Sequence, residues 1–343
     1  MDKAFIIEKS IFIIVIFAFT MIMAMYSTWA ERKVAAFLQD RVGPNRAGWG
    51  GLLQPLADGM KLFAKEEFEP NTKNRFLFFV GPAIAMITAL MTSAVIPWGD
   101  KLHIFGRDVI LQATDTDSAL LYIFAVVSLG VYGIMIGGWA SNNKFSLMGA
   151  VRAASQMVSY EVAMGLSVIA LLMMTGTLSL KEISIQQSGM NWNVFYQPLS
   201  FLIFLICAFA ETNRTPFDLA ECESELIGGY HTEYSSMKMG FYLFAEYANM
   251  FISSTIIAVL FFGGYNYPGM SWVIEHWGVN IGNVIGIFVL FIKLCFFIFF
   301  FMWIRWTIPR FRYDQLMNLG WKILIPLSII NIIITGICIL AFK

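Results

Sequence analysis

The sequence predicts an all-α integral membrane protein with eight transmembrane helices in a tilted bundle and an interfacial amphipathic helix on the cytoplasmic side. Two observations support this fold class. Of the 343 residues, 58% are hydrophobic and only 13% are charged, whereas a soluble domain has about 25% charged residues. The charges are also clustered, which leaves long windows free of Asp, Glu, Lys and Arg. A chain this poor in charge cannot cover a soluble surface of its size.

Eight windows are near or above the roughly 20 residues that an α-helix needs to cross a bilayer. Seven contain no charged residue, and the eighth, from His276 to Ile304, is interrupted only by Lys293. The windows are apolar on all sides rather than alternating, which argues against a β-barrel. We therefore expect one membrane domain over residues 1–343, with spans at about 6–30, 76–98, 118–140, 153–178, 198–211, 238–263, 282–304 and 321–342.

The first apolar stretch is expected to remain as a membrane span. It runs from Ser10 to Ala30 and ends in the charged residues Glu31, Arg32 and Lys33. This is longer than the apolar region of a secretory signal peptide. We therefore interpret it as the first helix of the bundle.

An interfacial helix is expected over residues 51–66, in the loop after the first span. At 3.6 residues per turn one of its faces is apolar, formed by Leu52, Leu53, Leu56, Met60 and Phe63. The opposite face is polar, formed by Gln54, Asp58, Lys61 and Lys65. This pattern is typical of a helix that lies in the membrane surface.

The distribution of Lys and Arg predicts the orientation of the chain. Eight spans place both termini on one side of the membrane. The loops after the first, third, fifth and seventh spans hold 16 Lys and Arg residues, whereas the opposite side, with both termini, holds six. Because cytoplasmic loops are enriched in Lys and Arg, we expect a multi-pass protein of a bacterial cell inner membrane with both termini in the periplasm. The long, charged inner loops place the function on the cytoplasmic face.

The sequence lacks the patterns of several cofactor sites. The four cysteines have no C-x-x-C spacing, and the three histidines lie far apart. Iron–sulfur, haem and zinc sites are therefore not expected. Neither a P-loop nor a strand–G-x-G-x-x-G–helix unit occurs. We expect the chain to bind no metal, nucleotide or nucleic acid and to carry no redox centre of its own.

Four charged residues fall within or at the end of predicted spans. Glu161 and Glu246 lie near the starts of the fourth and sixth spans, Glu211 ends the fifth, and Lys293 is near the middle of the seventh. A charged group in the bilayer core costs roughly 3 kcal/mol or more and needs a partner, a wet cavity or neutralisation. For Glu161, Glu246 and Lys293 we favour a proton or ion path over structural pairing. Glu211 fits a cytoplasmic helix end equally well.

The segment 211–233 concentrates acidic residues around one base, Arg214. Glu221 and Glu225 have the spacing of neighbours on one helix face, where like charges repel. Crowded carboxylates cannot all ionise, so some of their pKa values should rise towards neutrality and allow proton exchange near pH 7. A solvated acidic loop is the alternative, but adjacent apolar residues favour partial burial. The six acids are Glu211, Asp218, Glu221, Glu223, Glu225 and Glu233.

Arginines form two groups at the cytoplasmic face. One group precedes the interfacial helix and the other follows the seventh span. Guanidinium groups at the membrane surface bind lipid phosphates, acids of partner proteins or the polar head of a ligand. Lipid or partner contact is the commoner role for any single arginine. The residues are Arg32, Arg41, Arg46, Arg305, Arg310 and Arg312.

The four inner loops also carry long motifs. They read ERKVAAFLQDRVGPNRAGWGGLLQPLADGMKLFAKEE (31–67), RAASQMVSYEV (152–162), AETNRTPFDLAECESELIGGYHTEY (210–234) and RFRYDQLMNLGWK (310–322). Together they resemble the quinone-pocket membrane subunit of respiratory complex I, the proton-translocating NADH-quinone oxidoreductase. The resemblance spans the chain, and the family has the eight helices expected here.

The resemblance implies that the chain forms the quinone-access tunnel and couples quinone reduction to proton pumping through a chain of carboxylates. It implies a tunnel lined by Glu31, Arg32, Arg41, Asp58, Arg305 and Arg310. It implies a proton-coupling group made of Glu161, Glu211, Asp218, Glu221, Glu223, Glu225, Glu233, Glu246 and Lys293.

The resemblance also implies the substrate and the partners. The substrate would be a quinone, menaquinone or ubiquinone, while NADH, FMN and iron–sulfur clusters would belong to partner subunits. The partners would be peripheral-arm subunits of the quinone site, small membrane subunits leading to antiporter-like subunits, and membrane lipid.

Two other functions fit part of the pattern. Buried acids and a buried lysine are also found in self-sufficient ion transporters, but the chain lacks internal repeats and paired helices broken by Gly or Pro. The equivalent subunit of a membrane-bound hydrogenase, in which no quinone binds, is the other alternative. The intact motif at 31–67, which would form the tunnel mouth, favours a quinone enzyme.

Overall fold

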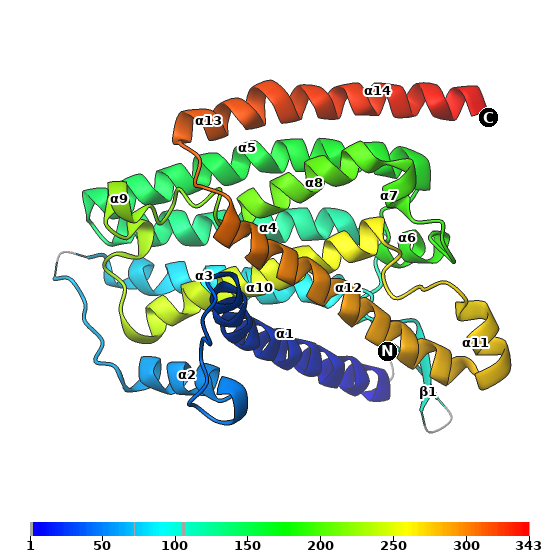
Figure 1. The fold of residues 1–343 in the computed structure, drawn as a ribbon, viewed down its shortest axis with the longest axis horizontal. Helices are drawn as coiled ribbons and strands as arrows, with labels where there is room; N and C mark the ends of the chain where they lie inside the picture. The colour runs from blue at the N-terminus through cyan, green and yellow to red at the C-terminus, as the bar shows by residue number, and fades with distance from the viewer. Residues whose placement is uncertain (1–2, 72, 105–106, 343) are drawn as a thin grey trace.

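In the computed structural model, which describes residues 3–71, 73–104 and 107–342, long tilted helices lie side by side (Figure 1). Both ends of the chain lie at the same end of the bundle, which also carries a short β-hairpin on the side away from the C-terminus (Figure 1). Helices α2 (Gln54–Ala64) and α9 (Glu223–Leu226) lie at the opposite end. The loops rich in charge therefore gather at one end of the molecule.

Within the described residues, seven helices are long and apolar enough to cross a membrane. The seventh is continuous from α13 (Tyr313–Asn318) through a π-helical turn, η4 (Leu319–Leu324), into α14 (Ile325–Phe342). The remaining predicted span, the fifth in chain order, corresponds to α8 (Pro198–Glu211), which at 14 residues is shorter than the others. The other six are α1 (Lys3–Leu38), α3 (Arg75–Thr92), α4 (Ala119–Ala140), α5 (Lys144–Thr175), α10 (Ser236–Phe261) and α12 (Val279–Thr307).

Short helical elements connect the long ones. On the side of α2 and α9 they include η1 (Trp49–Gly51) and η3 (Gly229–His231). The remaining short elements are η2 (Ser93–Val95), α6 (Leu180–Gln186), α7 (Asn193–Tyr196) and α11 (Met270–Trp277).

Two helices extend beyond the apolar windows that predict them. Helix α1 continues through Glu31, Arg32 and Lys33, which the sequence places in a loop. It can do so because Glu31 is buried against Arg305 of α12. Helix α5 begins at Lys144 rather than near residue 153, with the Asn143 side chain accepting a hydrogen bond from the Phe145 amide at its N-terminus. Charged residues next to an apolar window therefore do not end these helices.

A β-hairpin makes the fold not wholly α-helical. Strands β1 (Lys101–Ile104) and β2 (Arg107–Ile110) pair antiparallel in the loop between α3 and α4. Asn280 of α12 exchanges two hydrogen bonds with the backbone of His103, at 2.7 and 3.0 Å, and so docks the hairpin on the start of α12. The isolated pair of four-residue strands depends on this support, because two-stranded hairpins are at best marginally stable alone.

Glycines bring α3, α4 and α10 into close contact. A Cβ atom on Gly137 would lie 1.9 Å from the Tyr242 hydroxyl oxygen, and one on Gly81 would lie 2.9 Å from the Gly137 Cα atom. The Tyr242 hydroxyl donates to the Gly133 carbonyl oxygen at 3.1 Å. Small residues of this kind let membrane helices pack backbone to backbone. The contact fixes α10, which carries residues of the candidate site.

We expect Gly137→Ala to lower the stability of the protein by about 1–3 kcal/mol, because the new methyl group overlaps Tyr242 and packed interiors resist added volume. Gly165→Ala is the matched control, since a Cβ atom there meets nothing within 4 Å. The measurement is the thermal unfolding midpoint of the detergent-solubilised complex. Equal midpoints for the two variants would show that α4 and Tyr242 separate without cost.

Candidate functional site: a pocket joined to a buried charge network

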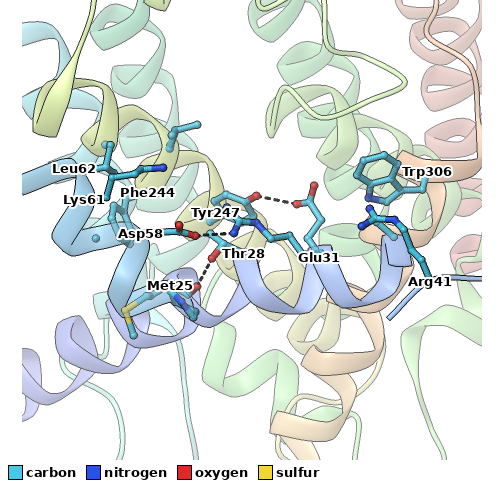
Figure 2. A pocket seen from close by; sticks show the side chains of 16 residues that line it. Met25, Thr28, Glu31, Arg41, Asp58, Lys61, Leu62, Phe244, Tyr247 and Trp306 are labelled. Carbon is cyan, nitrogen blue, oxygen red and sulfur yellow. Dashed lines mark hydrogen bonds and ion pairs between the residues drawn. The ribbon is translucent and has the colours of Figure 1, made fainter. Parts of the chain in front are cut away.

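A cavity of about 320 Å³ lies between α1, α2, α10 and the end of α12. Its lining is mixed, with apolar side chains such as Met25, Phe244 and Trp306 beside polar ones such as Thr28 and Tyr247. Figure 2 shows these side chains converging from the different elements. A cavity of this size, with a few polar groups among apolar ones, is typical of a site for a small amphipathic molecule.

Helix α2 is fixed as one wall of this cavity. Asp58 of α2 forms an ion pair with Arg32 of α1, with Oδ2 and Nη1 2.8 Å apart. The Ser236 hydroxyl, at the start of α10, donates to the Leu62 carbonyl oxygen at 2.9 Å. Gly51 (φ +83°) allows the tight approach of the preceding loop, because a Cβ atom there would lie 2.4 Å from the Pro44 carbonyl oxygen.

Four of the six predicted tunnel residues line the cavity, namely Glu31, Arg32, Arg41 and Asp58. Arg305 lies directly behind Glu31 and forms an ion pair with it. Arg310 is instead on the loop after α12, where it donates to the Asp218 carboxylate at 2.7 Å. The structure therefore brings five of the six into one connected group and places Arg310 with the acidic loop.

Glu31 connects the cavity to the protein interior. It is 6% exposed, and its carboxylate accepts a hydrogen bond from the Tyr247 hydroxyl at 3.0 Å (Figure 2). The same carboxylate lies 3.7 Å from Nη1 of Arg214. Arg214 is 5% exposed, and its guanidinium carbon stacks 4.1 Å from the centre of the Tyr247 ring. A buried arginine thus lies directly behind the cavity wall.

Arg214 is the central cation of the site, although by sequence it is only the single base of an acidic segment. Its Nη2 lies 3.6 Å from Oε2 of Glu246, so the side chain spans two carboxylates. The preceding residue, Asn213, has a positive φ of 49°, a conformation that asparagine tolerates better than most residues. Gln156 of α5 donates to the Ala210 carbonyl oxygen at 2.7 Å and to Asn213 Oδ1 at 3.3 Å. These contacts end α8 and turn Arg214 inward.

Glu246 continues the network towards the acidic loop. The Tyr230 hydroxyl donates to Glu246 Oε1 at 2.9 Å, and the Glu221 side chain is hydrogen-bonded to Glu246. Burial, followed by the charges of Glu246 and Asp218, raises the pKa of Glu221 well above its ordinary value. Burial also raises the pKa of Asp218, to about 6, although Arg310 opposes the shift. Burial therefore raises the pKa values of two acids of this loop, Asp218 and Glu221.

The other acids of the segment have different surroundings. Glu225 is exposed and paired with Arg152 of α5, and Glu233 accepts a hydrogen bond from Asn143 at 2.6 Å. The expected common helix face for Glu221 and Glu225 is wrong, because α9 begins at Glu223, after Glu221. The side chain of Glu223 lies outside the described residues.

Glu211 and Glu161 lie farther along the bundle. Glu211, the last residue of α8, borders two small cavities of about 30 and 20 Å³. The first cavity also touches Glu246, and Asn249 borders both. Glu161 of α5 is hydrogen-bonded to the Ser128 hydroxyl of α4. It borders an open groove of about 540 Å³ along α4, α5 and the π-helical turn.

Lys293 does not join these acids in the described part of the chain. Its ammonium group donates to the backbone carbonyl oxygens of Phe262, Gly264 and Asn266, at 2.7, 2.8 and 2.7 Å. It also lies 5.2 Å from the centre of the Trp192 ring. These carbonyls follow the end of α10, so the lysine closes that helix terminus.

Comparison with known proteins places this arrangement in a family. Residues 11–336 match the model of the family described as NADH dehydrogenase. The chain is 85% identical over its full length to the H subunit of the NADH-quinone oxidoreductase of Flavobacterium psychrophilum, also over all of that protein. It is 64% identical to an H subunit from Cytophaga hutchinsonii, over 98% of each chain. It is 45% identical to an H subunit from Geobacter sulfurreducens, over 95% of this chain and 93% of the relative. The chain therefore belongs to the NADH dehydrogenase family that includes the H subunits of NADH-quinone oxidoreductases.

Proposed function

We propose that the chain is the membrane subunit of a proton-translocating NADH-quinone oxidoreductase that admits quinone and passes the charge of its reduction to a proton path. One observation carries this proposal. Glu31 lines the pocket, and buried Arg214 bridges Glu31 to Glu246 at 3.7 and 3.6 Å. Pocket and interior acids are thus joined by a single side chain.

The pocket suits a quinone by its chemistry. A quinone has two carbonyl oxygens that accept hydrogen bonds and an apolar isoprenoid tail. Two side chains that line the cavity, Arg41 and Lys61, carry N–H donors. On α2, Leu56, Met60 and Phe63 are exposed. We infer that this face of α2 lies in the membrane surface and lets menaquinone or ubiquinone enter from the bilayer.

The position of the termini supports eight membrane crossings. Both termini lie at the same end of the bundle (Figure 1), which requires an even number of crossings. Seven long helices account for seven crossings, so α8 makes the eighth. The short helix α7 precedes α8, and only Gln197 separates the two. We infer a bacterial inner-membrane protein with both termini in the periplasm and the charged loops in the cytoplasm.

Electrostatics gives the proposed coupling its strength. Doubly reduced quinone is anionic until it takes up two protons. A negative charge beside Glu31 draws Arg214 towards the pocket and away from Glu246. Two unit charges about 4 Å apart interact by about 4 kcal/mol at an effective dielectric constant near 20. This exceeds the 2.3 kcal/mol or so needed to move one charge across 100 mV.

When Arg214 moves away, the negative charge of Glu246 is no longer compensated and acts on the acids next to it. The charge of Glu246 acts on the pKa of Glu221, and the two small cavities that Glu211 borders have room for one or two water molecules. Glu161, in its open groove, would pass the proton signal to small membrane subunits that lead to antiporter-like subunits. NADH, FMN and iron–sulfur clusters would belong to partner subunits, including those that complete the quinone site in the peripheral arm. Lys293 takes a structural role in this scheme.

We expect Thr28→Phe to raise the KM for quinone about tenfold, which corresponds to 1.4 kcal/mol of lost binding. The phenyl ring would occupy part of the cavity. Ser10→Phe is the matched control, because Ser10 is also on α1 and also bonds to the helix backbone, yet is exposed outside the cavity. The measurement is NADH-driven reduction of added quinone by membranes. An unchanged KM for Thr28→Phe would place the quinone elsewhere.

We expect Arg214→Gln to abolish proton pumping and to destabilise the complex by about 3–5 kcal/mol, since it leaves buried Glu246 without its cation and Glu31 with Arg305 alone. Arg312→Gln is the control, because Arg312 is exposed and its surface pair with Asp314 contributes about 1 kcal/mol at most. Assembly is followed on native gels, and pumping by dye quenching in vesicles. Full pumping by an assembled Arg214→Gln complex would rule out the bridge.

We expect Glu221→Gln to reduce pumping per quinone reduced, whereas Glu225→Gln leaves it near the wild-type value. The first carboxyl is hydrogen-bonded to Glu246, but the second is an exposed partner of Arg152. Pumping and quinone reduction are measured in the same vesicles, after confirming equal amounts of complex. Equal behaviour of the two variants would mean that the position of Glu221 next to Glu246 has no part in coupling.

A further inference from the structure

Two consecutive residues, Tyr230 and His231, contact the two acids of the Glu221–Glu246 pair, one acid each. The Tyr230 hydroxyl donates to Glu246 from the inner side. The next residue, His231, places Nδ1 3.3 Å from Oε1 of Glu221. Tyr230 is buried, whereas the His231 and Glu221 side chains keep 18% and 21% of their surface exposed. The pair therefore has one end in the interior and one end near the loop surface.

Tight backbone packing positions His231 beside Glu221. Gly229 begins the turn η3 with φ +65°, and a Cβ atom there would lie 1.7 Å from the Ala220 carbonyl oxygen. A Cβ atom on Gly149 of α5 would lie 2.8 Å from the Tyr230 amide nitrogen. Residues 220 and 229 can approach this closely only because both glycines lack side chains. The contact between His231 and Glu221 follows from the course of the backbone.

We propose that His231 is the residue through which the Glu221–Glu246 pair exchanges protons with water at the loop surface. This inference rests on the proposed function and adds to it a second proton entrance, separate from the quinone pocket. The proposed entrance is separate from the pocket because neither His231 nor Glu221 lines that cavity.

The chemistry of imidazole suits this role. Histidine is the side chain whose ordinary pKa, about 6.5, places its charge change near neutral pH. The ring takes a proton from water on one nitrogen and, as imidazolium, gives the proton on Nδ1 to the Glu221 carboxylate. One proton enters and one leaves, and the neutral ring then returns to its first tautomer by exchange with water. Glu221 has by then passed its own proton to Glu246, so that its carboxylate can accept the new one.

Other charged groups near the turn have partners of their own. On α5, Arg152 is paired with Glu225. At the start of α5, Asn143 donates a hydrogen bond to Glu233. Arg214 and Asp218 act on Glu221 through their charges, in opposite directions, and Tyr230 contacts the imidazole ring edge-on, with ring centres 5.3 Å apart. Among the described residues of this turn, His231 combines a partly exposed side chain with a contact to Glu221.

The test uses membranes that carry the assembled complex with His231→Gln, or His231→Asn if the first variant assembles poorly. Quinone reduction and proton pumping are measured from pH 6 to 9. His231→Gly is measured with and without added imidazole. His276→Gln is the matched control, because His276 lies on α11 at the other end of the bundle and bonds to the Trp272 carbonyl oxygen.

We expect His231→Gln to lower pumping at least roughly threefold. A positioned acid–base group typically contributes about 100-fold to a proton transfer, but other steps share control of turnover. The pH profile should lose an inflection that the control keeps, and imidazole should restore His231→Gly. A wild-type profile in His231→Gln, or a loss that imidazole does not restore, would overturn the inference. If the wild-type complex itself neither reduces quinone nor pumps, the proposed function fails instead.

Discussion

The burial of Arg214 constrains the rest of this structure. An unpaired charge in a protein interior costs several kcal/mol, so a buried guanidinium must be matched by carboxylates. Arg214 and Arg305 provide two positive charges against Glu31 and Glu246. The count balances when both carboxylates are ionised. Glu221, the third acid of the group, then has no cation of its own, and burial together with the charge of Glu246 raises its pKa.

This charge balance also fixes the arrangement of helices. Glu31 lies near the end of α1, Arg305 near the end of α12, and Glu246 within α10, while Arg214 is on the loop after α8. If any of these helices moved away, a charged side chain would be exposed to solvent or left buried without its partner. The pocket shares this framework, because α1 and α10 form two of its walls. A charge bound in the pocket therefore affects the protonation of the interior acids through the same ion pairs.

The sequence predicts most of the spans, because a charge-free window of bilayer length leaves little alternative. It fails where a charge is satisfied by a distant partner. Glu31 looks like a helix end, yet α1 continues because Arg305, 274 residues away, neutralises it. By sequence Arg214 is only the single base of an acidic segment, yet it is the centre of the site. Such pairings are invisible to local patterns, since they depend on which helices become neighbours.

Lys293 is another charged residue whose partners the sequence does not predict. A lysine within a predicted span suggests an ion path, but backbone carbonyls after α10 satisfy its ammonium group. Whether a buried charge finds a carboxylate or a helix terminus cannot be read from its position in the chain. The acidic segment behaves likewise, because spacing alone does not distinguish half-buried Glu221 from exposed Glu225.

The placement of Lys293 has a consequence for how coupling can occur. It holds the C-terminal end of α10, while Lys238 near the other end pairs with Glu67 and Glu69 and the Ser236 hydroxyl binds the Leu62 carbonyl. With both ends tied, α10 is poorly suited to move as a rigid body when the pocket is occupied. Tyr247 and Glu246 lie between these ties. Coupling through this helix is therefore better explained by shifts of the Arg214 side chain and of protons than by displacement of the helix.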